Sequence, residues 1–116
     1  MSEIVIPVIV LGTPTGGLPR MFQQVGETRV IPHDNPRETT CIFKALLNEC
    51  LTTKTALLLQ DVPVMLIGAL VLLSGRGVTP QIYATISRNI SSDGNQVTEM
   101  VGIFNVLTEK MVWELD

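Results

Sequence analysis

The sequence predicts an α+β fold in which two central helices, one of them fully apolar, pack against a small, mostly antiparallel sheet. A long N-terminal arm rich in proline and glycine precedes the helices. Apolar residues recur at helical spacing over residues 36–52, an unbroken apolar run covers residues 62–73, and apolar and polar residues alternate from residue 82 onward. For a chain of 116 residues we expect a single domain over residues 1–116.

The composition favours a buried or shared surface. Charged residues make up 16% of the chain, against roughly 25% in typical soluble domains, so less of the surface must face water. The net charge is −3, and the aromatic residues are three Phe, one Tyr and one Trp. Both features oppose a basic groove with stacking platforms, so we expect no nucleic-acid partner.

Residues 4–11 are rich in Ile and Val and predict a strand. Pro7 should confine it to a sheet edge or a bulge, because proline cannot donate a ladder hydrogen bond. Residues 12–35 show little periodicity, and so long a loop in a compact domain tends to be functional or bound to a partner. We expect this extended arm to reach another subunit and bind it through apolar side chains. These partner-binding candidates are Leu18, Met21 and Phe22.

Residues 36–52 are predicted to form an amphipathic helix. Asn35 is a good N-cap, Pro36 suits the first helical position, and Glu38 stands three residues after the cap, as in a capping box. One half of the helical wheel is apolar. That half consists of Ile42, Phe43, Leu46, Leu47, Cys50 and Leu51.

The apolar run at residues 62–73 predicts a second helix, after a connector of undetermined type at residues 53–60. Asp61 is expected to cap this helix and Gly75 to end it. The run is too short to cross a bilayer, which needs about 20 apolar residues. A helix that is apolar all round is normally buried on all sides, here by its own chain or by a second subunit.

The C-terminal part of the chain is predicted to be β. Alternation over residues 82–90 is typical of a half-buried strand, and residues 91–95 form a strong turn signal. Residues 96–115 fit a helix or two strands. Strands are favoured, because Gly102 would weaken a helix and an Asp-Gly turn invites a hairpin.

The two cysteines should stay reduced. Cys41 and Cys50 would point to opposite sides of one helix, about 13 Å apart along its axis, so they cannot pair with each other. No signal-peptide pattern precedes them. We therefore expect a cytoplasmic or otherwise intracellular protein without a transmembrane segment, and peripheral contact with a membrane stays open.

No motif predicts catalysis, a metal or a cofactor. His33 adjoins Asp34, but neighbouring side chains in extended chain point to opposite faces, so Asp34 is badly placed to orient the imidazole. One His and two Cys do not make a tetrahedral metal site. The glycine-rich residues 12–17 lack the lysine of a phosphate-binding loop. The candidate ligand-binding residues are Arg20, His33 and Arg76, all in loops.

These observations favour a non-enzymatic structural or assembly protein that associates with itself through the arm and an apolar surface. The order of elements is similar to that of small viral matrix-type assembly proteins, a likeness in element order alone, which implies an assembly role. One alternative is a small homo-oligomeric enzyme or ligand-binding protein with a site between subunits near His33. Another is a monomeric adaptor that exposes a groove.

Overall fold

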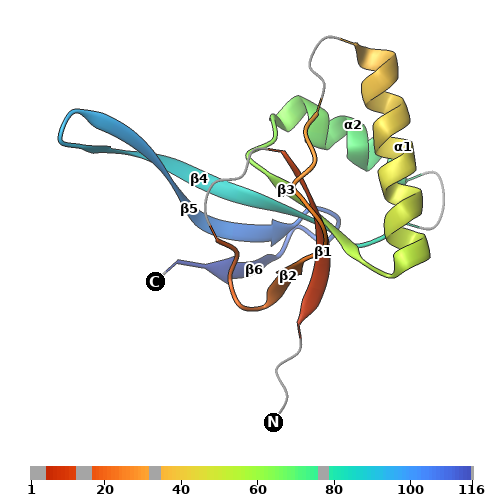
Figure 1. Ribbon diagram of the computed structural model, residues 1–116, viewed down its shortest axis with the longest axis horizontal. Helices are drawn as coiled ribbons and strands as arrows, with labels where there is room; N and C mark the ends of the chain where they lie inside the picture. The colour runs from red at the N-terminus through yellow and green to blue at the C-terminus, as the bar shows by residue number, and fades with distance from the viewer. Residues whose placement is uncertain (1–4, 13–16, 32–34, 76–78, 116) are drawn as a thin grey trace.

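The computed structural model describes residues 5–12, 17–31, 35–75 and 79–115, and within these ranges the chain forms one six-stranded sheet and two helices (Figure 1). The elements in chain order are β1 (Ile6–Gly12), β2 (Phe22–Gln24), α1 (Pro36–Thr53), β3 (Ala56–Gln60), α2 (Val64–Ser74), β4 (Ile82–Ser92), β5 (Asn95–Asn105) and β6 (Met111–Glu114).

The sheet, and not the helices, dominates the fold, so the predicted fold class is wrong. The strand order is β2-β1-β3-β4-β5-β6. The first four strands run parallel to one another, and β5 and β6 add to them in antiparallel pairs. The result is a curled, mixed half-barrel rather than two central helices on a small antiparallel sheet (Figure 1).

Both helices lie on the same face of the sheet (Figure 1). The connections from β1 to β3 and from β3 to β4 move in the same direction across the sheet, and parallel crossovers are almost always right-handed, which places both on one side. The main core forms between the helices and this face. Its buried members include Ile9, Leu11, Phe43, Leu46, Leu57, Leu59, Leu70 and Ile82.

Neither of the two helices in the described residues lies over the opposite face, which is covered by the curl of the sheet itself. Its buried residues include Val8, Val10, Leu58, Tyr83 and Ile103. The rings of Phe22 and Tyr83 meet edge to face with their centroids 5.2 Å apart. The parallel strands therefore carry apolar side chains on both faces, as buried parallel strands do.

β1 is an internal strand, so the prediction that Pro7 marks an edge or a bulge is wrong. The N–H of Ile6 and the carbonyl of Val8 bond toward β2. Pairing with β3 begins at Val8, opposite Ala56, one residue beyond Pro7. The missing N–H of Pro7 therefore falls where no ladder bond is required.

The first helix is confirmed. The side chain of Asn35 accepts hydrogen bonds from the backbone N–H groups of Arg37 and Glu38, at 3.0 and 3.2 Å. The helix ends at Thr53, and the C-cap Lys54 adopts a left-handed conformation with φ 57. Cys41 is exposed and Cys50 is buried, and both are free thiols, as predicted.

The segment between the helices contains a central strand. β3 lies within residues 53–60, and all five of its residues are buried. Asp61 does not cap the second helix as predicted. It has φ 57, and its N–H donates to the Thr85 hydroxyl at 3.0 Å. The N-cap is Pro63, which makes no side-chain capping bond, whereas the predicted end at Gly75 is confirmed.

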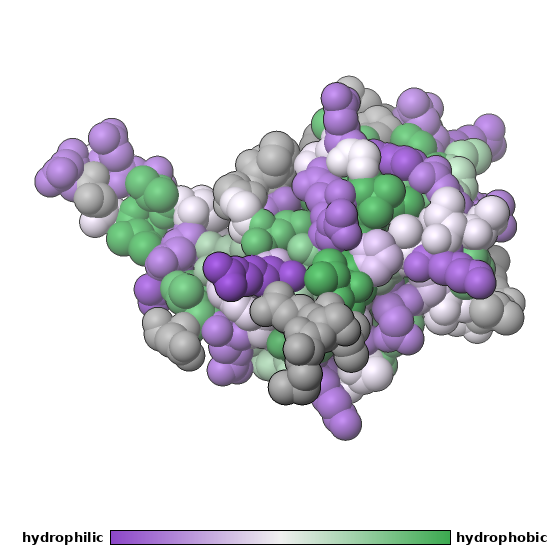
Figure 2. All heavy atoms as spheres, turned by 60° about the horizontal axis from the view of Figure 1, so that its bottom comes forward, coloured by the Kyte–Doolittle hydropathy of each residue, from purple (hydrophilic) through white to green (hydrophobic). Residues whose placement is uncertain are grey.

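The β4–β5 hairpin and the strand assignment for the C-terminal part are confirmed. Asp93 and Gly94 form the turn with φ 51 and 79, the pair of positive values that a tight hairpin turn requires. The register shifts between Ile86 and Ser87, which leaves Val101 as the extra residue in β5. Beyond this bulge the hairpin projects from the body of the molecule (Figures 1 and 2).

Candidate functional site: the exposed face of α2

The second helix is exposed on one side, although its sequence predicted burial on all sides. Of the eleven residues of α2, only Leu70 and Ser74 are buried. Val64, Met65 and Leu72 have exposed fractions of 83%, 87% and 75%. The prediction of all-round burial is therefore wrong for the single chain.

The exposure follows from how α2 sits on the sheet. Leu66, Ile67, Leu70 and Leu73 face the main core. The opposite side carries Met65, Gly68, Ala69 and Leu72, at helical spacing and all exposed. We call these four residues the α2 face. A surface helix normally places polar residues on this side, so the α2 face departs from the usual pattern of a surface helix.

The middle of the α2 face lies lower than its two ends, because Gly68 and Ala69 are small residues. An added Cβ at Gly68 would meet no heavy atom within 4 Å, so the space above it is open. Gly68 and Ala69 thus form a low step between the longer side chains of Met65 and Leu72. Small residues of this kind allow a second backbone to approach closely.

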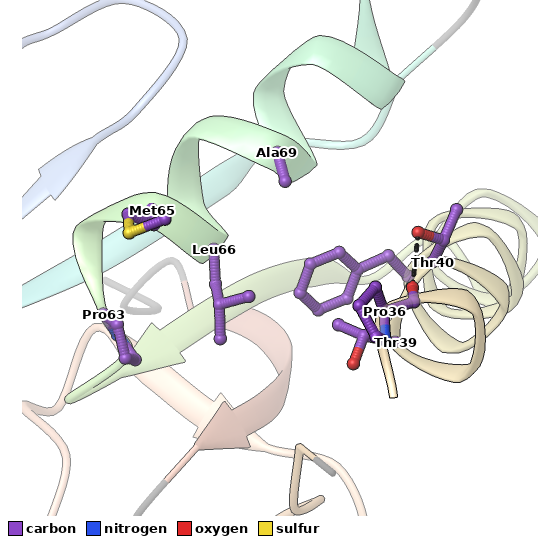
Figure 3. A pocket seen from close by; sticks show the side chains of 8 residues that line it. Pro36, Thr39, Thr40, Pro63, Met65, Leu66 and Ala69 are labelled. Carbon is purple, nitrogen blue, oxygen red and sulfur yellow. Dashed lines mark hydrogen bonds between the residues drawn. The ribbon is translucent and has the colours of Figure 1, made fainter. Parts of the chain in front are cut away.

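Two apolar grooves flank the α2 face. A cavity of about 340 Å³ lies between α1 and α2, and Figure 3 shows Leu66 and Ala69 pointing across it toward α1. A more open groove of about 740 Å³ lies on the other side of α2, where Phe104 and Val106 form its far wall. The grooves extend the apolar surface beyond the helix itself.

The α2 face and the cavity beside it offer few charged or reactive side chains. Residues 62–75 include no charged side chain. In the cavity between the helices, the Thr39 and Thr40 hydroxyls donate to the carbonyls of Asn35 and Pro36, at 3.0 and 2.9 Å. Because both hydroxyls already donate their protons to carbonyls at the start of α1, the cavity offers apolar contact rather than acid–base or nucleophilic groups.

The predicted partner-binding residues lie against the chain's own second core. Phe22 is buried with an exposed fraction of 6%, and Leu18 and Met21 are partly buried beside it. The segment around them belongs to the sheet, because β2 pairs with β1 and Arg29 bridges to Leu11. Their binding to another subunit stays a prediction, and it would require them to leave this core.

The candidate ligand-binding residues are only partly placed. Arg20 is exposed in the turn before β2. His33 and Arg76 lie outside the described residues. In the described ranges, no group of three or more His, Cys, Asp or Glu side chains is placed to hold a metal. Neither helix of the described chain is long and apolar enough to cross a membrane.

One ion pair ties the segment after β2 to α1. The Arg29 guanidinium donates to both carboxylate oxygens of Glu49. This bonding lowers the pKa of Glu49 below its ordinary value and raises the pKa of Arg29. Burial raises the pKa of the neighbouring Cys50 thiol, which keeps it protonated and unreactive.

No protein-family model, curated protein or solved structure matches this chain. Sequence reasoning singled out the apolar run but missed its exposed side, because a run without polar residues has no periodicity that separates an inner from an outer face. The one feature of the sequence that could have indicated the exposed side is the Gly68–Ala69 pair of small residues within the apolar run.

Proposed function

We propose that this chain is a non-enzymatic, self-associating protein that builds a homo-oligomer through the α2 face. The observation that carries the proposal is a solvent-exposed helix surface of four apolar residues with no charge on it. Removing apolar surface from water favours association, and the lost translational and rotational freedom of the two chains offsets part of that gain.

A second copy of the chain suits this surface. In a two-fold interface a charged side chain close to the symmetry axis meets the same charge on the other copy. Residues 62–75 carry none, so pairing along α2 itself incurs no such repulsion, although Glu109 lines the wider of the two grooves. A stable interface buries about 800 Å² on each partner, more than one helix face supplies, so the contact must extend over the flanking grooves.

We also propose an intracellular location. The support is the pair of free thiols, one of them exposed on α1, because an exposed unpaired cysteine is typical of a reducing compartment. The likeness to viral matrix-type proteins adds no support, since the element order of the structure includes β2 and β3, which were absent from that comparison.

A charge placed on the α2 face tests the proposed function. Leu72→Asp should reduce the oligomer to the 12.7 kDa of one chain in size-exclusion chromatography with light scattering, and the monomer should still unfold cooperatively. Val30→Asp is the matched control, because Val30 and Leu72 are both 75% exposed. The proposal is wrong if Leu72→Asp keeps the oligomeric mass, or if both variants lose it equally.

A further inference from the structure

Met100, at the base of the projecting part of the β4–β5 hairpin, packs against the second core, and the rest of the projection lies beyond both cores. Six residue pairs continue the hairpin past the bulge, from Ser87 opposite Met100 to Ser92 opposite Asn95. An isolated two-stranded hairpin is marginal in water, because it has little apolar surface to bury. Such an arm is expected to rest on another surface.

The two faces of the hairpin differ. On one face, Asn89 and Thr98 lie opposite each other and share a side-chain hydrogen bond of 3.3 Å. On the other face, Ile90 lies directly opposite Val97, and these side chains are 36% and 53% exposed. Figure 2 shows apolar side chains on the projection just behind its hydrophilic tip. We call Ile86, Ile90 and Val97 the hairpin strip.

We propose that the hairpin strip of one chain docks on the α2 face of a second copy, and that the second copy returns the same contact. This inference rests on the proposed self-association and names the element that reaches the partner. Each copy would then supply one hairpin strip and one α2 face, and a two-fold pair would cover both surfaces on both chains.

The dimensions of the two surfaces agree. Six paired positions at about 3.4 Å per residue give the projecting hairpin a length of about 20 Å. The eleven residues of α2 at 1.5 Å per residue give a helix of about 16 Å. The hairpin can therefore lie along the whole helix, with Val97 and Ile90 beside the step at Gly68 and Ala69.

The charges also agree. The only charged pair on the apolar side of the hairpin is Arg88 with Glu99, which lie opposite each other and bond at 2.9 and 3.0 Å. Because this pair neutralises itself, the hairpin strip presents no net charge to the uncharged α2 face. Within one chain the hairpin strip and the α2 face stay exposed, so they do not cover each other.

Disulfide trapping between two populations of the full chain tests this contact. Both populations carry Cys41→Ser to remove the exposed native thiol. One carries Val97→Cys and the other Leu72→Cys, and each is oxidised alone and in a mixture. A disulfide-linked dimer that forms in the mixture, and in neither population alone, is the expected result. A mixture of Val30→Cys with Leu72→Cys measures linking by random collision.

The other outcomes separate this inference from the proposed function. If Leu72→Cys links strongly by itself, two α2 faces pack on each other, which overturns the hairpin contact but supports self-association. A dimeric mass without any specific link also overturns the hairpin contact alone. A monomeric mass without a link overturns both, and binding of that monomer to lipid vesicles would then identify the cover as a membrane surface.

A charge on the hairpin gives a second, independent measurement. Val97→Lys should shift the mass in solution from twice 12.7 kDa toward one chain, whereas Thr98→Lys on the polar face should leave it unchanged. Both residues are exposed, so neither change threatens folding of the body. Equal effects of the two variants would contradict docking through the hairpin strip.

Discussion

The two helices lie on the same face of one sheet, yet they differ in what they present to solvent. α1 buries Phe43, Leu46 and Cys50 and shows mostly polar residues on its outer side, with Leu51 exposed at 38%. α2 buries Leu70 and Ser74 and shows Met65 and Leu72. α1 therefore has the usual pattern of a surface helix, whereas α2 exposes apolar residues on its outer side. Under the proposed function, α1 serves folding alone and α2 also serves assembly.

The largest expected effect is on folding stability, and it distinguishes a residue that stabilises the fold from one that stabilises the oligomer. Phe43→Ala should lower the free energy of unfolding by about 3–5 kcal/mol, because it empties a fully buried position under α1. Leu72→Ala should change the stability of the single chain by less than about 0.5 kcal/mol and weaken association instead. Urea unfolding of dilute protein measures the first effect, and light scattering the second. Similar losses of stability in both variants would break the comparison between the helices.

The N-terminal caps give a smaller effect. Asn35→Ala removes the side-chain oxygen that accepts from two backbone N–H groups of α1, and should cost about 1 kcal/mol in urea unfolding. Asn35→Ser keeps a capping oxygen and should retain most of the stability. If both variants lose the same amount, the cap does not stabilise α1.

Gly68→Ala should change folding and association in opposite directions. A helix interior favours Ala over Gly by about 0.5–1 kcal/mol, and the added Cβ meets open space, so the single chain should melt at a higher temperature. The same Cβ fills the step in the α2 face and should raise the dissociation constant of the oligomer. Tighter association in this variant would show that the step is not part of the contact.

The smallest effect is the pH dependence of the Arg29–Glu49 pair. Because the pKa of Glu49 is lowered in the folded chain, its contribution to stability is present above the ordinary value of 4.5 and is lost as pH falls through the folded pKa. Urea midpoints followed into acid should fall less steeply for Glu49→Gln than for the parent chain. Parallel curves would contradict a stabilising role for this exposed pair.

Local signals predicted the local elements well. Asn35 and the apolar stripe that follows it specify α1, and the Asp93–Gly94 turn specifies the β4–β5 hairpin, because capping and turn geometry depend on neighbouring residues. β3 was missed. It is buried on both faces, so it shows no alternation and reads as a short apolar run. Without β3 the parallel half of the sheet could not be foreseen, and the fold class was wrong for that reason.

The candidate site was predicted only in part. The apolar run drew attention to α2, but the side that faces solvent is set by the orientation in which Leu66 and Leu70 meet the sheet. The role given to Phe22 as a partner-binding residue depended on a free arm. Its place beside Tyr83 depends on pairing between β2 and β1, which no residue in the arm signals by itself.

The mass of the unmodified chain across a dilution series tests the central claim most directly. If a second copy covers the α2 face, light scattering should give a mass near twice 12.7 kDa at high concentration, falling toward 12.7 kDa on dilution as the two chains separate. A mass of one chain at every concentration would contradict the account.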